Sequence, residues 1–222
     1  MNSLTRRLIA KDLYLQRGLI GIAVVAGLVS LVIAAEGRMR FNIGVLGWIT
    51  TVIALGIMVA MQGLVNERKE RAQLFVLSLP LSHGDYVRVK MLALLACYVP
   101  AWLVLSVAAV ALMLVMPNLP DGMVPYTVLL SVYMLTNFAV VLSGALHTSS
   151  EGVLTALIIV TNMCVSVFIF VIFAIRGIAD HFQGPTPVWN DAFWTVLGIE
   201  LLVFALAVCL PYLIAARRRD HI

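Results

Sequence analysis

Charged side chains are scarce in this sequence of 222 residues. Only 12% of the residues are Asp, Glu, Lys or Arg, and 62% are hydrophobic. A soluble domain has about 25% charged and about 45–50% apolar residues. The composition, with a mean hydropathy of +1.03, therefore excludes a soluble globular domain and predicts an integral membrane protein.

Several kinds of site are missing as well. Cys97, Cys164 and Cys209 each lie within an apolar run and form no Cys-x-x-Cys pair, which excludes a disulfide framework and a zinc site. His147 has no second His or Cys at metal-ligand spacing, so we interpret it as an interfacial residue. No Gly-x-x-x-x-Gly-Lys-Ser/Thr loop is present to hold phosphates, and no Gly-x-Ser-x-Gly turn or pair of intramembrane aspartates indicates an intramembrane enzyme.

Long apolar runs are the main feature of the sequence. A hydrocarbon core of about 30 Å needs about 20 apolar residues per helix, and six segments meet this requirement. The sequence therefore predicts an all-α integral membrane protein with one transmembrane domain over 1–222. The expected spans are approximately residues 18–35, 43–65, 91–116, 126–146, 152–175 and 193–215. No small-residue cleavage site follows the first run, so it is expected to be a retained helix.

The basic residues are distributed unevenly between the two sides of these spans. If the N-terminus lies inside, twelve Lys and Arg residues fall in inner segments and only Arg38, Arg40 and Arg176 in outer loops. The positive-inside rule then places both termini in the cytoplasm of a cell whose inner (plasma) membrane holds the chain. Because the basic residues lie at the ends of apolar runs, the net charge of +4 indicates lipid headgroups and topology, not nucleic acid.

The N-terminal stretch before the first span, residues 1–17, mixes apolar and basic residues. Leu4, Leu8 and Leu15 share one helical face, but Leu13 lies opposite. The stretch is either an interfacial helix that leads into the first span or a short disordered basic tail.

The inner segment Asn66–Lys90 carries eight of the 26 acidic and basic residues. Apolar residues from Ala72 to Leu79 recur at helical spacing after a charged turn, which predicts an amphipathic helix. Pro80 ends this helix, because proline has no backbone N–H and disfavours helical geometry in the residue before it. Ser82, three residues before Asp85, then forms a capping box for a helix that continues into the third span.

The short inner loop between the fourth and fifth spans is also polar. Thr148 stands three residues before Glu151, a spacing typical of a capping box that starts the fifth span. The loop therefore has a structural explanation, and it could also contact a cytoplasmic partner.

Few polar residues lie within the spans. Glu200 is the only acidic residue well inside one, where a charge costs roughly 2.5–3.5 kcal/mol on insertion scales. It is either a polar point on a substrate path or a packing residue that is protonated, hydrogen-bonded or reached by Arg176. Asn137 and Asn162 likewise either line a cavity or form hydrogen bonds between helices. These three are the candidate residues of a translocation path.

Two stretches resemble ABC transporter permeases of the ABC-2 type. The run Glu67-Arg68, then Leu77-Ser78-Leu79-Pro80-Leu81-Ser82, then Tyr86-Val87-Arg88-Val89-Lys90 is similar to that family's segment after the second span, where a Leu-Pro-x-Ser turn precedes a lysine that opens the next helix. Ile9-Ala10-Lys11-Asp12-Leu13 is similar to the family's N-terminal interfacial opening. The resemblance covers the whole chain in architecture and about twenty-five residues in motif.

The resemblance implies a half-transporter. Two six-span permeases, identical or related, would pair, and each would be bound by a separate ATP-binding subunit, which carries the ATP and magnesium. Segment 66–90 would dock into a cleft of that subunit, and the loop containing Glu151 would make a second, smaller contact. The residues assigned to this coupling are Glu67, Arg68, Glu70, Arg71, Phe75, Leu79, Pro80, Ser82 and Glu151.

The function expected from the resemblance is ATP-driven export of an amphipathic substrate, whether lipid, peptide or drug-like. The alternative is an ATP-independent small transporter or channel, which would need more intramembrane charge or a repeat of broken helices. For segment 66–90 itself, the alternative is a loop that folds onto the headgroups, although its charges are mixed in sign and a lipid-binding patch is Lys and Arg alone. The last outer loop, residues 176–192, is shorter than in permeases with a large external cap.

Overall fold

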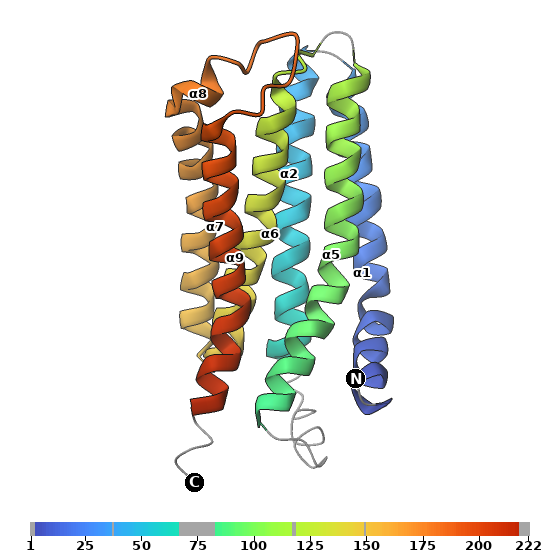
Figure 1. Ribbon diagram of the computed structural model, residues 1–222. Coiled ribbons are helices and arrows are strands. Elements are labelled where there is room, and N and C mark those ends of the chain that lie inside the picture. The colour runs from blue at the N-terminus through green and yellow to red at the C-terminus, as the bar shows by residue number, and fades with distance from the viewer. Residues whose placement is uncertain (1–2, 37, 67–82, 117–118, 149, 218–222) are drawn as a thin grey trace.

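The computed structural model describes residues 3–36, 38–66, 83–116, 119–148 and 150–217. Within these ranges the chain is helical and contains no β-strand. Figure 1 shows the elements in order along the chain. They are α1 (Ser3–Ala35), α2 (Arg38–Ala60), the π-helical turn η1 (Met61–Asn66), α5 (His83–Val115), α6 (Met123–His147), α7 (Glu151–Ala174), α8 (Arg176–Ala179) and α9 (Asp191–Arg217).

Six of the described helices are long and apolar enough to cross a membrane, which confirms the predicted all-α fold with six spans. Each expected span lies on one of these helices, and its C-terminal end agrees with that of the helix to within two residues when η1 is counted with α2. The helices extend beyond the expected spans because polar residues at their ends continue the backbone hydrogen bonds outside the apolar core. The largest extension is in α1, which begins at Ser3 and not at Gly18. α5 begins at His83, as predicted for a helix that starts after Ser82 and continues into the third span.

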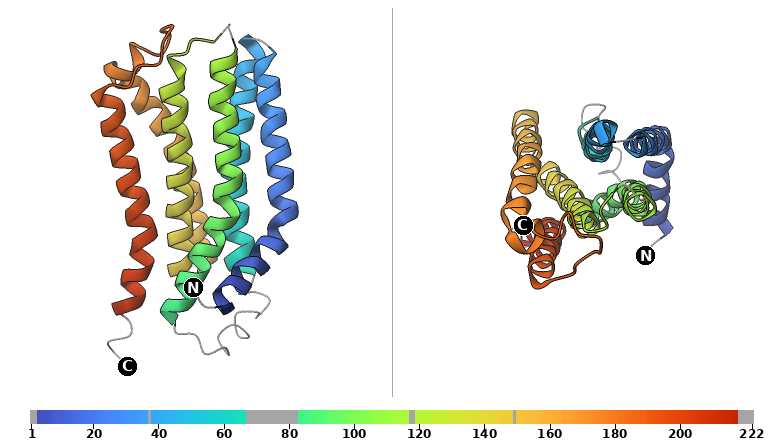
Figure 2. Two further views of the ribbon diagram at one scale, coloured as in Figure 1. Left: turned by 45° about the vertical axis from the view of Figure 1, so that its right-hand side comes forward. Right: turned by 90° about the horizontal axis from the view of Figure 1, so that it is seen from above.

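The six long helices run up and down in turn, so α1 begins and α9 ends at the same end of the bundle (Figure 1). We call this the inner end and the opposite one the outer end. α1, α2 and α5 pack together on one side, and α7 and α9 lie on the other, with α6 between the two groups (Figure 2). Accordingly 67% of the α6 span is buried, against 17% for α7 and for α9.

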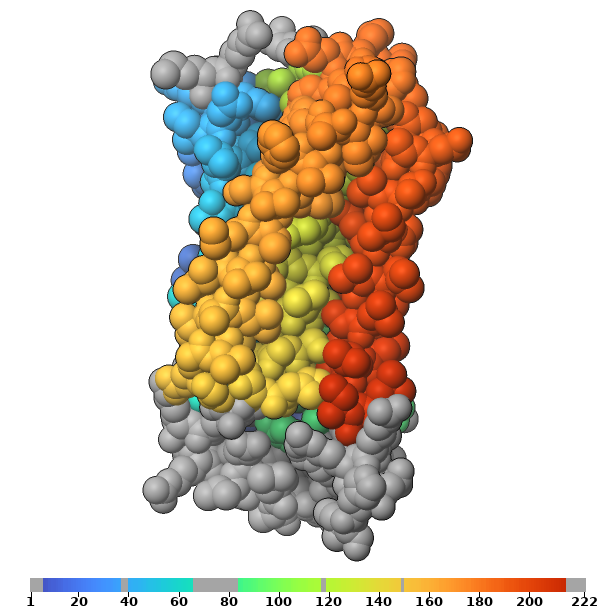
Figure 3. Space-filling model, turned by 90° about the vertical axis from the view of Figure 1, so that its left-hand side faces the viewer, coloured from blue at the N-terminus to red at the C-terminus, as the bar shows by residue number. Residues whose placement is uncertain are grey.

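α7 and α9 cover α6 incompletely. Figure 3 shows the side chains of α6 between these two helices over much of the height of the bundle. Cys164 on α7 and Cys209 on α9 are exposed, whereas Cys97 on α5 is buried. Two of the three cysteines therefore lie at the surface of the bundle and one is packed inside it.

Aromatic side chains join α5 to α6. The Tyr98 and Phe138 rings stack with centroids 4.0 Å apart, and Trp102 Nε1 donates a hydrogen bond to the Ser131 carbonyl at 2.7 Å. Pro100 lies between these two contacts, near the middle of α5, and α5 bends there (Figure 1). The bend follows from the missing proline N–H and the clash of its ring with the preceding turn.

The first turns of α1 depart from the bundle axis. They are helical from Ser3 onward and cross the inner end at a steep angle before the helix turns upward (Figure 2). Of the two interpretations of this stretch, the helix is therefore confirmed and the disordered tail is wrong for the described residues.

α1 and α2 approach closely near the outer end. A Cβ at Gly44 would overlap the backbone of Ser30 and Ala34, and one at Gly47 would lie 2.7 Å from Ser30 Oγ. Small residues at such positions let two helix backbones come close together inside a membrane. Lipid tails are as apolar as the helix side chains, so close packing and not the hydrophobic effect must hold the helices together.

Replacement of Gly44 by alanine is expected to destabilise the protein. The added methyl group meets backbone atoms, which cannot rotate away, so the expected loss is about 1–3 kcal/mol, as for other overpacked sites. The melting temperature of the purified protein in detergent measures the effect. Gly18→Ala on α1, where no atom lies within 4 Å of the added Cβ, is the matched control. Equal melting temperatures for the two variants would show that α1 and α2 do not pack as described.

Candidate functional site

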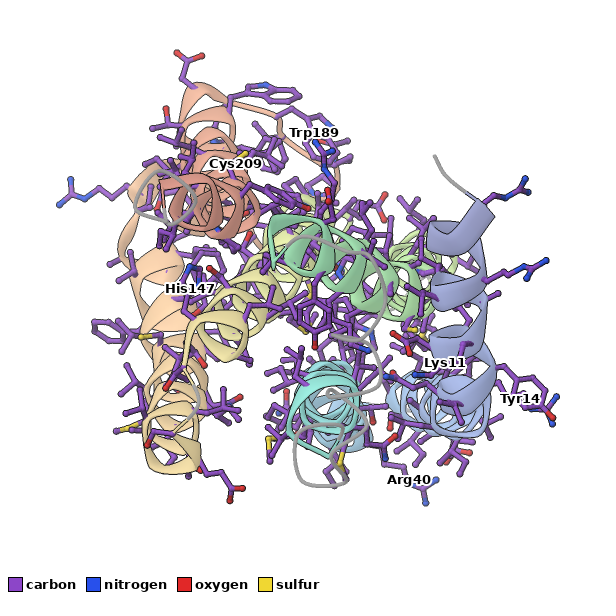
Figure 4. The ribbon with its side chains drawn as sticks, turned by 90° about the horizontal axis from the view of Figure 1, so that it is seen from below. Lys11, Tyr14, Arg40, His147, Trp189 and Cys209 are labelled. Carbon is purple, nitrogen blue, oxygen red and sulfur yellow. The ribbon has the colours of Figure 1, made fainter. Side chains whose placement is uncertain are left out.

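The segment with the strongest functional signal is described only at its two ends. Of the residues assigned to partner coupling, those from 67 to 82 lie outside the described residues, and so does the expected amphipathic helix. They are Glu67, Arg68, Glu70, Arg71, Phe75, Leu79, Pro80 and Ser82. The described flanks are η1 and the start of α5, which both lie at the inner end (Figure 4, seen from that end).

The flank that precedes the segment is a π turn. A π turn holds an extra residue in the helix, and such turns are frequent at functional sites. Gly63 lies in this turn, and a Cβ there would overlap the Leu94 side chain and lie 3.3 Å from Gln16 Nε2. The π turn therefore sits directly against both α5 and α1, and glycine permits this close approach.

The flank that follows the segment is tied to α1 by a buried ion pair. Lys90 Nζ lies 2.7 Å from Asp12 Oδ2, and the two side chains are only 6% and 7% exposed. Lys11 Nζ lies 3.8 Å from Asp12 Oδ1 and is partly exposed at the edge of the pair. The two stretches that carry the ABC-2 resemblance, 78 residues apart in sequence, thus meet through one salt bridge.

The first turns of α1 direct two polar side chains inward. Asp12 and Gln16 are buried against the bundle, whereas Tyr14 and Leu15 are 63% and 65% exposed. Figure 4 shows Tyr14 pointing away from the bundle. The face toward the protein thus includes polar residues, and Leu15 is not on it. The sequence signal that could have identified it is the polar pair Asp12 and Gln16 at i, i+4 spacing.

The second inner loop is capped differently from the prediction. The N-cap of α7 is Ser150, whose Oγ accepts a hydrogen bond from Val153 N, and Thr148 Oγ1 accepts one from Ser150 N. Thr148 is therefore not the capping residue, because it lies two residues before the N-cap and does not reach the first free N–H groups of α7. Glu151 is exposed in the first turn of α7. His147 Nδ1 contacts the Ser143 carbonyl of its own helix at 2.8 Å, as suits an interfacial residue.

The three candidate path residues do not form one cluster. Asn162 lies on α7 and donates a hydrogen bond to the Ile158 carbonyl of the same helix, at 2.8 Å. Glu200 lies on α9, and its carbonyl accepts a hydrogen bond from Thr136 Oγ1 of α6 at 3.4 Å. Asn137 lies on α6 and is buried. The carboxyl group of Glu200 forms no hydrogen bond with either asparagine.

Glu200 is buried and its carboxyl group has no polar partner among the described residues. Its side chain is buried, with 5% of the residue exposed, and neither carboxyl oxygen has a hydrogen-bond partner among the described residues. Asn137 Oδ1 is likewise buried and unpartnered there. The suggestion that Arg176 reaches Glu200 is wrong, since Arg176 is exposed in α8 at the outer end and both carboxyl oxygens of Glu200 lack a described partner. The Glu200 carboxyl group and the Asn137 amide oxygen are thus buried acceptors without partners among the described residues.

A cavity of about 390 Å³ lies between α5 and α6, on the outer side of Pro100. Its lining is almost entirely apolar and includes Trp102, Val110 and Val128. Ser106 also lines it, and the Ser106 hydroxyl is buried without a described partner. Asn137, Asn162 and Glu200 are not part of this lining.

The described helices define a multi-pass α-helical membrane protein. At its inner end, η1 and the start of α5 flank one polar segment of the sequence. The family model described as "ABC-2 family transporter protein" matches residues 7–217. The chain therefore belongs to the ABC-2 family of transporter proteins and is an ABC transporter permease, a membership that implies an ABC ATP-binding subunit as partner. No curated protein and no solved structure matches the chain.

Breaking the ion pair is expected to cost more than removing it. Asp12→Asn or Lys90→Met removes one charge of the pair and leaves the other buried, which costs about 3–5 kcal/mol for buried pairs, whereas the double variant removes both. We expect each single variant to melt at a lower temperature than the double variant. The three melting temperatures, measured in the same detergent, test this. A double variant that loses the sum of the two single losses would show that the two charges do not interact.

Proposed function

We propose that this chain is the membrane-spanning permease subunit of an ATP-driven exporter. The observation that carries the proposal is the family match over residues 7–217, which includes the segment between α2 and α5. Support from the geometry is that both described flanks of this segment are held against α1, by Gly63 and by Lys90. A segment that is held at both ends can transmit the movement of a bound partner to several helices.

The partner in this proposal is a separate ATPase subunit that docks on segment 66–90. Glu67, Arg68, Glu70 and Arg71 supply polar contacts, Phe75 and Leu79 the apolar anchor, and Pro80 and Ser82 the turn. Glu151, exposed in the first turn of α7, belongs to the smaller second contact. Two ATPase copies would serve a pair of permeases, homodimeric or heterodimeric, and ATP with magnesium would bind to the ATPase, since this sequence has no phosphate-binding loop of its own.

The substrate class that fits best is amphipathic: a lipid, a peptide or a drug-like molecule. An almost wholly apolar cavity between α5 and α6 supports this choice, because such a space suits an apolar portion of a ligand. The unpartnered oxygens of Glu200 and Asn137 are polar groups that a path through the bundle could use. Asn162, bonded within its own helix, contributes to the path only if that bond is exchanged.

The docking contact is tested by removing two of its charges. We expect Glu67→Ala with Arg71→Ala to leave the permease inserted in the membrane but to abolish its co-purification with its ATPase subunit. The physical reason is that the contact loses an acidic and a basic partner on one turn of the docking segment. Affinity purification from detergent-solubilised membranes, with quantified ATPase, measures the result.

The matched control is Glu36→Ala with Arg40→Ala. These two residues form an exposed acidic-basic pair at the same four-residue spacing, but at the outer end of the bundle. The control is expected to co-purify with the ATPase as the wild type does. Normal co-purification and full ATPase stimulation by the Glu67 and Arg71 variant would place the docking site elsewhere.

The orientation in the proposal, with both termini in the cytoplasm, has a direct test. In a variant whose three cysteines are replaced by alanine, a cysteine at Thr186 in the outer loop is expected to react with a membrane-impermeant maleimide in intact cells. A cysteine at Glu151 is expected to react only after the cells are permeabilised. Both positions are exposed in the structure, so access and not burial decides the labelling. The reverse pattern would invert the topology.

A further inference from the structure

The Asp12–Lys90 ion pair lies where two functional signals of the sequence converge. Lys90 follows segment 67–82 on α5, and Asp12 belongs to the first turns of α1, which cross the inner end of the bundle (Figure 4). The ion pair therefore joins the end of the proposed docking segment to the N-terminal helix.

The other flank of the segment meets the same face of α1. Gly63 in η1 lies next to Gln16, which is one helical turn after Asp12. Asp12 and Gln16 stand at i and i+4 and are both buried. A short stretch of α1 thus contacts Gly63, which precedes the docking segment 66–90, and Lys90, the last residue of that segment, although neither contact is local in sequence.

A buried ion pair is not the energetically most favourable way to hold two helices together, so its presence here calls for another reason. A buried pair gains little over well-packed apolar side chains, since both charges lose their hydration. What it adds is a single geometry: the amine and carboxylate must stay within hydrogen-bond distance, whereas apolar side chains tolerate sliding. The pair at 2.7 Å thus fixes the position of α5 along α1.

We infer that Asp12 and Lys90 are positioning residues for energy coupling, which make the first turns of α1 a moving part of the ATPase-driven device. The inference rests on the proposed function. When the docked ATPase displaces segment 66–90, the ion pair carries that displacement from the start of α5 to α1, and through α1 to the α1–α2–α5 side of the bundle. Without the pair, the ATPase still docks but its movement is not transmitted to α1.

The test uses the complete complex of permease and ATPase in lipid vesicles. The variants are Asp12→Asn, Lys90→Met and the charge exchange Asp12→Lys with Lys90→Asp. Two quantities are measured: the amount of ATPase that co-purifies, and the rate of ATP hydrolysis of the complex relative to the ATPase alone. Arg17→Gln is the matched control, because it removes a charge from the same helix on the exposed face, where Arg17 lies over the Tyr14 ring at 4.1 Å.

We expect both single variants to co-purify normally and to lose the permease-dependent change in hydrolysis by about fivefold or more, the usual lower size of a coupling between sites. The charge exchange should recover most of this loss, and Arg17→Gln should behave as wild type. A purely structural role would lower co-purification and the hydrolysis rate together, in proportion to the folded protein. If a single variant does not accumulate in the membrane, Asp12→Glu takes its place. This variant keeps the negative charge but lengthens the side chain. We expect it to co-purify with the ATPase and to show a reduced rate of ATP hydrolysis.

Two results overturn the inference alone: single variants that co-purify and keep the full hydrolysis change, or a charge exchange that inserts and co-purifies but recovers nothing. A wild-type chain that neither binds an ATPase nor alters its rate overturns the proposed function, and this inference with it. The Glu67 and Arg71 variant distinguishes the two levels, since it removes docking and leaves the ion pair in place.

Discussion

The inner end of this bundle depends on one buried ion pair. Asp12 and Lys90 are both charged side chains at the border of the apolar region, where either one alone would be costly. Paired at 2.7 Å, they hold the first turns of α1 against the start of α5. Gly63 completes the arrangement, because the absence of a side chain lets the π turn reach α1 and α5 at the same level. The polar segment between α2 and α5 is consequently anchored at both described ends.

α6 organises the rest of the bundle. It is the most buried of the long helices, and it joins the α1–α2–α5 group to α7 and α9. Its contacts differ on its two sides. Toward α5 it offers Phe138 for aromatic stacking and a carbonyl for Trp102, which stay paired around the bend at Pro100. Toward α9 it offers the Thr136 hydroxyl, which donates a hydrogen bond to the Glu200 carbonyl at 3.4 Å, whereas the carboxyl oxygens of Glu200 have no described partner.

Hydropathy predicted the elements of the fold well and their contacts poorly. The six spans follow from run length alone, since a hydrocarbon core admits only a narrow range of helix lengths. The N-terminal stretch permits two interpretations from sequence, because Leu15 and the basic residues Lys11 and Arg17 are all exposed while the polar Asp12 and Gln16 are buried, so no clear amphipathic pattern forms. The cap of α7 was assigned to Thr148 because the spacing to Glu151 fits a capping box, but Ser150 is closer to the first free N–H groups. The connection of Arg176 to Glu200 failed because the chain turns into α8 before that side chain can descend along the helix.

The sequence by itself determined the class of protein, the number of spans, the distribution of basic residues and the position of the polar segment between the second and third spans. These properties depend on composition and on distance along the chain, which the linear order of residues states directly. Tertiary structure alone decided that Asp12 meets Lys90, that Gly63 meets Gln16, and that Glu200 and Asn137 have buried oxygens without described partners while Asn162 bonds within its own helix. The physical reason is that helices in lipid are brought together by shape and by rare polar contacts, and the direction in which each helix turns those few side chains follows from its packing and not from its hydropathy.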